Sequence, residues 1–251
     1  PYYEKYSGDS WSEAYVLGSY SDFMNLLERF FNGSESAGKY YAINDDIDLS
    51  AVANFQSIGS ESNPFRGHFN GNGKTITIPA NVRGLFGLVD TDGIAIQSLN
   101  VRTGFSLYNG ASGNNPPSDY AGGIVQELVN GTITNCTFTG TVTADDAESS
   151  AGGIVGLLSG GTIQNCRVLS GSGIYASHSA GGIAGYVMAG SITGCTSDAE
   201  VDADFSGGIA GYTESERQNI TANTFTGTAV EVGNDELSLA LLPTRQTVRA
   251  G

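Results

Sequence analysis

Short apolar blocks alternate with glycine and asparagine along most of the chain, and two of these blocks recur. The first block occurs as AGGIV from Ala121 and Ala151, AGGIA from Ala180 and SGGIA from Ser206. These starts lie 30, 29 and 26 residues apart. The second block follows as GTITNC from Gly131, GTIQNC from Gly161, GSITGC from Gly190 and NITAN from Asn219. The chain therefore repeats one unit, with small insertions between copies.

The composition of the repeating unit predicts strands. Its blocks are too short and too rich in Gly, Thr and Ile for helices, so each unit is expected to contain two or three short strands. Units of this length bury their apolar side chains by coiling, and each strand pairs with its counterpart about 4.8 Å along the axis. We therefore predict an all-β fold, a single-stranded parallel β-helix or solenoid.

The second block predicts a bend within each coil. In TITNCTFTGTV, Ile133 has one side-chain parity, whereas Cys136, Phe138 and Val142 have the other. A plain strand cannot point both sets inward, so the chain must turn between Ile and Cys. The residue before each Cys is of a type that tolerates a left-handed backbone. We interpret these residues as structural corners: Asn135, Asn165 and Gly194.

The repeats extend beyond the cysteines in both directions. The segment from Gly84 aligns with that from Gly153, and ITANTFTG from Ile220 aligns with ITNCTFTG from Ile133. One structural core column then reads Leu99, Cys136, Cys166, Cys195 and Asn223. Because Leu99 occupies this aligned position in one coil, we expect the side chains of the column to pack in the hydrophobic core.

The three cysteines are interpreted as buried free thiols. Their number is odd, and in-register Cβ atoms about 4.8 Å apart exceed the ~3.8 Å that a disulfide prefers. Stacked thiolates binding a soft metal ion are the alternative, but no Cys-x-x-Cys pair or nearby His supports it. We expect no metal site and no cofactor.

An amphipathic helix is predicted ahead of the coils. In SYSDFMNLLERFFNG the apolar residues recur at helical spacing, with Ser21 as a candidate N-cap and Gly33 as a stop. Such a helix would cap the open end of the solenoid, although its aromatic face could also be a docking surface. We expect an N-terminal segment with this capping helix over residues 1–37, the β-helix over 38–231, and a C-terminal tail or cap over 232–251.

Composition narrows the classes of partner. The chain has 36 glycines among 251 residues, about twice the average usage of about 7%. Its 11 basic and 26 acidic residues give a net charge of -15, which disfavours nucleic acids and anionic lipid surfaces. No apolar stretch is long enough for a membrane span, so we expect no direct membrane insertion. Only 15% of residues are charged, and an uncharged polar surface suits an extracellular β protein.

The recurring Gly-Gly-Ile-Val-Gly and Gly-Thr-Ile-x-Asn-Cys blocks resemble the GLUG motif. This motif occurs in large secreted and surface-anchored bacterial proteins, including adhesin-like proteins and some immunoglobulin A peptidases. GKYYAINDDIDLS from Gly38 and FQSIGSESNPFRGHFNGNGKTITI from Phe55 also resemble the segment that often precedes such repeats. The resemblance covers roughly residues 20 to 230, and it departs from the motif at Gln126 and Asn223. It implies a β-helix with a stalk or adhesive role, because the peptidase members carry catalysis in a separate domain.

Candidate chemistry is sparse. His68 and His178 are in no metal-binding pattern, and His178 is expected to be a solvated loop residue. No nucleophile elbow or nucleotide-binding loop occurs. The acidic clusters DDIDL, ADDAE and DAEVDAD are interpreted as surface or turn segments, although paired carboxylates can also hydrolyse glycosides or bind calcium.

One long segment predicts a binding loop. The interval from Leu85 to Ile124 is 39 residues, against 30 for the next, so FSLYNGASGNNPPSDY carries an insertion. Its candidate ligand-binding residues are Tyr108 and Tyr120, which could stack on sugar rings, and Asn114 and Asn115, which could bond hydroxyls. An ordinary surface loop is the alternative.

These observations favour a non-enzymatic, extracellular or cell-surface β-helix module, adhesin-like, that binds a polysaccharide or a host surface glycoprotein. No catalytic residue is assigned. Two alternatives stay open: a polysaccharide-degrading lyase or glycosidase, by analogy of fold alone, and a passive stalk or spacer.

Overall fold

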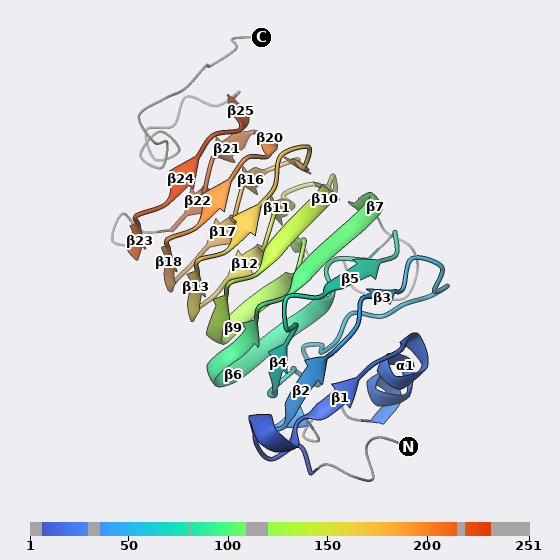
Figure 1. The fold of residues 1–251 in the computed structure, drawn as a ribbon. Coiled ribbons are helices and arrows are strands. Elements are labelled where there is room, and N and C mark those ends of the chain that lie inside the picture. The colour runs from blue at the N-terminus through green and yellow to red at the C-terminus, as the bar shows by residue number, and fades with distance from the viewer. Residues whose placement is uncertain (1–6, 30–35, 81, 109–119, 215–218, 232–251) are drawn as a thin grey trace.

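The computed structural model describes residues 7–29, 36–80, 82–108, 120–214 and 219–231. Over these residues the chain forms a parallel β-solenoid of about 6 turns, which confirms the predicted fold class (Figure 1). The described strands pair in parallel and form three sheets, here called A, B and C, which are the three faces of the coil. Besides the short 3₁₀ turn η2 (Trp11–Glu13), the described part contains one helix, α1 (Tyr20–Arg29).

Sheet A has eleven strands in the described residues: β1 (Tyr15–Leu17), β2 (Tyr40–Ile43), β4 (His68–Asn70), β6 (Phe86–Gln97), β9 (Val125–Thr134), β12 (Val155–Leu158), β13 (Thr162–Gln164), β17 (Ala184–Val187), β18 (Ser191–Thr193), β22 (Ala210–Thr213) and β23 (Asn219–Thr221). Sheet B has ten there: β3 (Ile47–Asp48), β5 (Thr75–Ile78), β7 (Asn100–Tyr108), β10 (Thr137–Ala144), β14 (Arg167–Val168), β15 (Gly173–Ala176), β19 (Thr196–Ser197), β20 (Glu200–Ala203), β24 (Thr224–Phe225) and β25 (Thr228–Glu231). Sheet C has four there: β8 (Tyr120–Gly122), β11 (Ser150–Gly152), β16 (Ser179–Gly181) and β21 (Phe205–Gly207).

From β8 onward, the described coils pass through the three sheets in the same order, whereas the earlier coils have described strands in sheets A and B only. One coil runs from β11 of sheet C through β12 and β13 of sheet A to β14 and β15 of sheet B, and then enters β16. The repeat spacing sets the register between coils: Ser150 pairs with Ser179, and Ile163 pairs with Ile192. The sequence repeats therefore become columns of equivalent residues along the axis.

The corner between sheets A and B is a single residue with a left-handed backbone. Successive coils place Ser98, Asn135, Asn165, Gly194 and Ala222 there, with φ values of 50°, 54°, 53°, 65° and 57°. The corner reverses the side-chain parity of the strand. Ile133 before it and Cys136 after it are therefore both fully buried.

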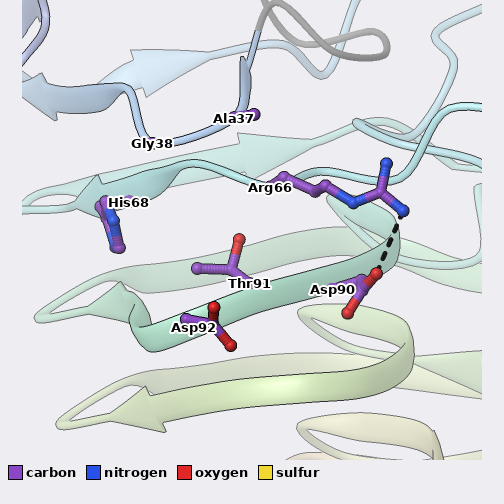
Figure 2. Close-up of a pocket in the computed structure, with 7 residues that line it drawn as sticks. All are labelled: Ala37, Gly38, Arg66, His68, Asp90, Thr91 and Asp92. Carbon is purple, nitrogen blue, oxygen red and sulfur yellow. Dashed lines mark hydrogen bonds and ion pairs between the residues drawn. The ribbon is translucent and has the colours of Figure 1, made fainter.

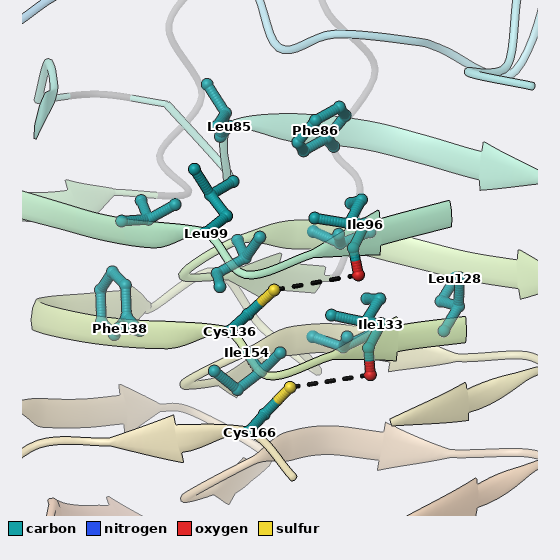
Figure 3. Packing of buried hydrophobic residues seen from close by; sticks show 14 of the residues in the cluster. Leu85, Phe86, Ile96, Leu99, Leu128, Ile133, Cys136, Phe138, Ile154 and Cys166 are labelled. Carbon is teal, nitrogen blue, oxygen red and sulfur yellow. Dashed lines mark hydrogen bonds between the residues drawn. The ribbon is translucent and has the colours of Figure 1, made fainter. Parts of the chain in front are cut away.

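One continuous hydrophobic core fills the coil, and its residues change along the axis. Large aromatic side chains, including Tyr41, Phe65, Phe69 and Phe86, pack in the N-terminal coils. In the following coils Leu, Ile, Val and Cys form regular stacks (Figure 3). The core reaches Phe225 of β24 near the C-terminal end of the described chain.

The helix α1 lies beside β1 at the N-terminal end of the solenoid (Figure 1). Phe23 and Leu26 are buried in the core, as a capping helix requires. The N-cap is Ser19 and not Ser21, because Ser19 Oγ accepts a hydrogen bond from the Asp22 backbone N–H at 3.1 Å. The expected stop at Gly33 lies outside the described residues.

The sheets also bear on the expected segment boundaries. β1 precedes residue 38 and already pairs with β2, so sheet A begins within the segment assigned to residues 1–37. The tail over residues 232–251 lies outside the described residues. The division of the chain into three segments stays a prediction.

Candidate functional site

Five aromatic rings from three coils form one patch on the outside of the solenoid, here called the aromatic surface: Tyr120, His178, Tyr186, Phe205 and Tyr212. Ring centroids of Tyr186 and Tyr212 lie 5.1 Å apart, and those of Tyr120 and Tyr186 lie 6.1 Å apart. Phe205 lies 5.6 Å from Tyr212 and 5.1 Å from His178. All five side chains are half-buried, so the rings pack against one another and keep part of their surface in solvent.

The register of the coils brings these rings together. Tyr186 and Tyr212 are the third residues of β17 and β22 and pair directly across sheet A. Tyr120 and Phe205 are the first residues of β8 and β21 at the adjoining edge of sheet C. The small Ser150 and Ser179 occupy the register positions between them, which leaves room for the larger rings.

Carboxylates lie at two sides of the aromatic surface. The Tyr186 hydroxyl donates a hydrogen bond to Glu214 Oε1 at 3.1 Å. Burial, and after it this hydrogen bond, raises the pKa of Tyr186 to about 12, so its hydroxyl stays neutral at ordinary pH. His178 Nδ1 lies 3.8 Å from Glu148 Oε2, and the two form an ion pair when His178 is protonated. These acidic groups make the surface unfavourable for anionic ligands.

The predicted binding residues separate in the structure. Tyr120 belongs to the aromatic surface, but Tyr108 is the last residue of β7 and pairs with Thr143 of β10. Tyr108 therefore lies in a strand and not in a protruding loop. Asn114 and Asn115 lie outside the described residues.

The sequence analysis did not identify four residues of the aromatic surface as binding residues: His178, Tyr186, Phe205 and Tyr212. His178 is not a solvated loop residue, because its side chain is only 27% exposed and packs against Phe205. Tyr186 and Tyr212 both follow a Gly-Ile-Ala-Gly run in the repeats, and this shared position is a signal that could have identified them. Phe205 has no such signal.

A second feature is a groove of about 540 Å³ on the outer face of sheet B. Asp46 and Asp48 lie in it together with Arg102 and Arg167, as a carboxylate-based hydrolase would require. Asp46 Oδ1, however, accepts the Thr75 N–H at 2.8 Å. Hydrogen bonds from Ser50 lower the pKa of Asp48, which is opposite to the shift that a general acid needs.

The cysteine column lies inside the coil. Cys136, Cys166 and Cys195 are buried free thiols, and Leu99 occupies the equivalent buried position one coil earlier. Figure 3 shows the thiols of Cys136 and Cys166 directed at main-chain carbonyl oxygens of the preceding coil. Burial raises the pKa of the Cys166 thiol well above its usual range. In the residues that the structure describes, no group of three or more His, Cys, Asp or Glu could hold a metal ion.

Asn223 ends this column with hydrogen bonds of its own. Its Nδ2 donates to the Ile192 carbonyl of the preceding coil at 2.9 Å. This hydrogen bond is equivalent to the contact of Cys195 Sγ with the Ile163 carbonyl at 3.7 Å. Its Oδ1 accepts the Cys195 N–H at 2.8 Å. The residues of this column therefore fill the core and bond main-chain groups, and both roles are structural.

The pairing of its strands places this chain among the parallel β-solenoids built from short repeats, and the aromatic surface lies on the side of the coil. The GLUG motif model matches residues 176–202, the coil that contains His178 and Tyr186, and this match confirms the resemblance inferred from the repeats. The crystal structure of a candidate immunoglobulin A1 protease from Bacteroides ovatus is similar, with a TM-score of 0.56 and 19% identity over 97% of this chain and 83% of that one. At this identity the similarity concerns the fold alone. No curated protein matches the chain in sequence.

Among the described residues, no helix is long and apolar enough to span a membrane.

Proposed function

We propose that this protein is a non-enzymatic, extracellular or cell-surface module that binds a glycan, in the manner of an adhesin. The observation that carries the proposal is the aromatic surface of Tyr120, His178, Tyr186, Phe205 and Tyr212. The ligand class is a neutral polysaccharide, or the neutral glycan of a host surface glycoprotein. The repeat architecture and the low content of charged residues support an extracellular setting.

Aromatic side chains suit sugar recognition because a pyranose ring has an apolar C–H face and a polar hydroxyl rim. The rings of Tyr186 and Tyr212 are tilted by only 32° to each other and can support consecutive sugar units. Their hydroxyls, and the Glu214 carboxylate beside Tyr186, can bond the rim. The glutamates disfavour sulfated or uronic-acid chains by like-charge repulsion.

Binding is favoured over catalysis by the chemistry of the sheet B groove, which holds two carboxylates beside two arginines. In the sheet B groove, Asp46 and Asp48 are already hydrogen-bond acceptors for main-chain N–H groups. The lowered pKa of Asp48 keeps that carboxyl ionised, so it is poorly suited to protonate a glycosidic oxygen. A passive spacer would have no need of an exposed cluster of rings from separate coils.

The proposal is tested by affinity electrophoresis of the full chain through gels that contain neutral or anionic polysaccharides, with parallel assays for chain shortening. We expect at least one neutral polysaccharide to retard the protein and to stay intact. Tyr212→Ala is expected to abolish most of the retardation. Tyr175→Ala is the matched control, because Tyr175 is a half-buried tyrosine on sheet B, away from the aromatic surface.

Three outcomes would contradict the proposal. Chain shortening that Asp48→Asn abolishes would establish an enzyme in the sheet B groove. Equal loss of retardation in Tyr212→Ala and Tyr175→Ala would remove the aromatic surface as the binding site. Retardation by no polysaccharide would favour the spacer.

A further inference from the structure

A second group of rings, with Trp11 exposed and Tyr40 and His68 half-buried, lies at the other end of sheet A, next to an open pocket. Tyr40 of β2 and His68 of β4 are register partners, and their rings stack at 4.3 Å. Trp11 of η2 meets Tyr40 edge-on at 4.8 Å and lies 6.4 Å from His68. Trp11 is 40% exposed, so part of its indole ring is open to a ligand.

The pocket begins at His68 and has a volume of about 310 Å³, near the lower end of the usual range for small-ligand sites. Its polar wall comes from β6, with Asp90, Thr91 and Asp92, and from Arg66 just before β4. Figure 2 shows the ion pair between Arg66 and Asp90 at one end of the pocket and His68 at the other. His68 therefore links the pocket and its row of polar groups to Tyr40 and Trp11, which lie beside the pocket and not in its lining.

The hydrogen-bonding state of these groups suits hydroxyl ligands. His68 Nδ1 lies 2.8 Å from the Ile94 carbonyl oxygen, which can only accept, so Nδ1 carries the hydrogen and the neutral ring keeps Nε2 as an acceptor. Asp92 Oδ1 accepts from Asn130 Nδ2 at 3.0 Å. A carboxylate offers about four lone-pair sites, so Asp92 keeps capacity for hydroxyl donors.

The charge of the pocket selects among sugars. Its two carboxylates, Asp90 and Asp92, outnumber the single guanidinium of Arg66, which is already paired with Asp90 at 3.1 Å. A carboxylated or sulfated sugar would face an uncompensated like charge. A neutral pyranose in the pocket can donate its hydroxyls to Asp92 and His68, and a sugar unit joined to it can contact the exposed indole beside His68.

The geometry points to a second glycan-binding site in this pocket, here called the N-terminal site, which takes a neutral pyranose and acts independently of the aromatic surface. Four strand steps separate β4 from β17 in sheet A, which places the two sites about 19 Å apart along the axis. One sugar unit cannot bridge the two sites. One protein molecule would therefore bind two separate sugars, or two points of one longer glycan. This inference adds a site to the proposed function and does not depend on the aromatic surface.

Trp11 makes the N-terminal site directly observable, because it is the single tryptophan of the chain. The full chain is titrated with lactose, maltose, cellobiose and N,N′-diacetylchitobiose, and with 3′-sialyllactose as the anionic arm, while tryptophan emission is recorded. We expect a saturable change with at least one neutral sugar and none with 3′-sialyllactose. Asp92→Ala and His68→Ala are expected to weaken that binding about 10-fold or more.

The matched control is Tyr186→Ala, which damages the aromatic surface and is expected to leave the Trp11 response unchanged. Circular dichroism and thermal unfolding confirm that each variant is folded, and the exposed position of Asp92 makes its variant the safest. No response to any of the four neutral sugars would overturn the inference, as would an equal response to 3′-sialyllactose. An unchanged affinity in folded Asp92→Ala would do the same. Loss of the Trp11 response in Tyr186→Ala would overturn the independence of the two sites.

Discussion

At the scale of single residues, the inside of the coil uses side chains to complete main-chain hydrogen bonding. The Cys166 N–H donates to Cys195 Sγ at 3.4 Å, and the Cys195 N–H donates to Asn223 Oδ1 at 2.8 Å. The amide of Asn223 thus takes the place that a thiol holds one coil earlier. A buried N–H without a partner would cost about 1–3 kcal/mol, which explains why a polar residue is tolerated in a packing column.

The same burial makes the thiols unreactive. Because the thiolate is the nucleophile and burial raises the pKa of Cys166, we expect no reaction of the native protein with Ellman's reagent at pH 8. In guanidinium chloride all three cysteines should react. Rapid reaction of any thiol in protein that keeps its native circular dichroism would contradict the buried column.

Ala222 is the one alanine at a corner of the coil, with φ at 57°. An L-residue with a Cβ pays roughly 1–2 kcal/mol for this conformation, and glycine does not. Ala222→Gly is therefore expected to raise the free energy of unfolding by about 0.5–1 kcal/mol, measured by urea denaturation.

The control for this prediction is Ala189→Gly, at an exposed position without a positive φ. There the same change should lower the free energy of unfolding, because glycine loses more backbone freedom on folding. Destabilisation of equal size at both positions would contradict the corner interpretation.

At the scale of elements, the paired glycines fix how closely neighbouring turns and strands approach. A Cβ added to Gly152 of β11 would lie 1.9 Å from the Val155 carbonyl oxygen and 2.6 Å from the Gly185 nitrogen. Both are backbone atoms, so no side-chain movement relieves the clash. The Gly-Gly block recurs because each passage from sheet C into sheet A needs this approach.

Gly152→Ala is therefore expected to lower the free energy of unfolding by about 3 kcal/mol or more, through overpacking. Gly171→Ala separates packing from backbone strain, because Gly171 has φ at 80° but a Cβ added there would meet no atom within 4 Å. Its cost should stay near 1–2 kcal/mol. Urea denaturation of both variants measures the difference, and similar costs would show that close approach is not the cause.

The sequence predicts the elements better than it predicts the sites. The repeats encode the coil and its corners locally, since residues such as Asn135 and Asn165 set the backbone where they stand. The aromatic surface follows the repeats only at Tyr186 and Tyr212, because the register position of Tyr120 holds Ser150 in the next coil and that of Tyr186 holds Leu157 in the preceding one. Such rings become neighbours only through stacking of coils.

At the scale of the whole molecule, the solenoid is a stack of coils whose outer faces present groups from separate coils. In sheet A, the strands β17 and β22, which carry Tyr186 and Tyr212, lie near one end, and β2 and β4, beside the proposed N-terminal site, lie near the other (Figure 1). The chain's net charge of -15 disfavours anionic polymers, in agreement with the proposal of a neutral glycan ligand. The two proposed sites would together raise the avidity for a long glycan chain.

Isothermal titration calorimetry on oligosaccharides of the retained polysaccharide measures whether the aromatic surface binds a neutral glycan. The dissociation constant is compared for the native chain, Tyr186→Ala and the sheet B control Tyr175→Ala. We expect Tyr186→Ala to weaken binding about 10-fold, equivalent to about 1.4 kcal/mol, and Tyr175→Ala to leave it unchanged. Native affinity in a folded Tyr186→Ala variant would contradict the proposed binding.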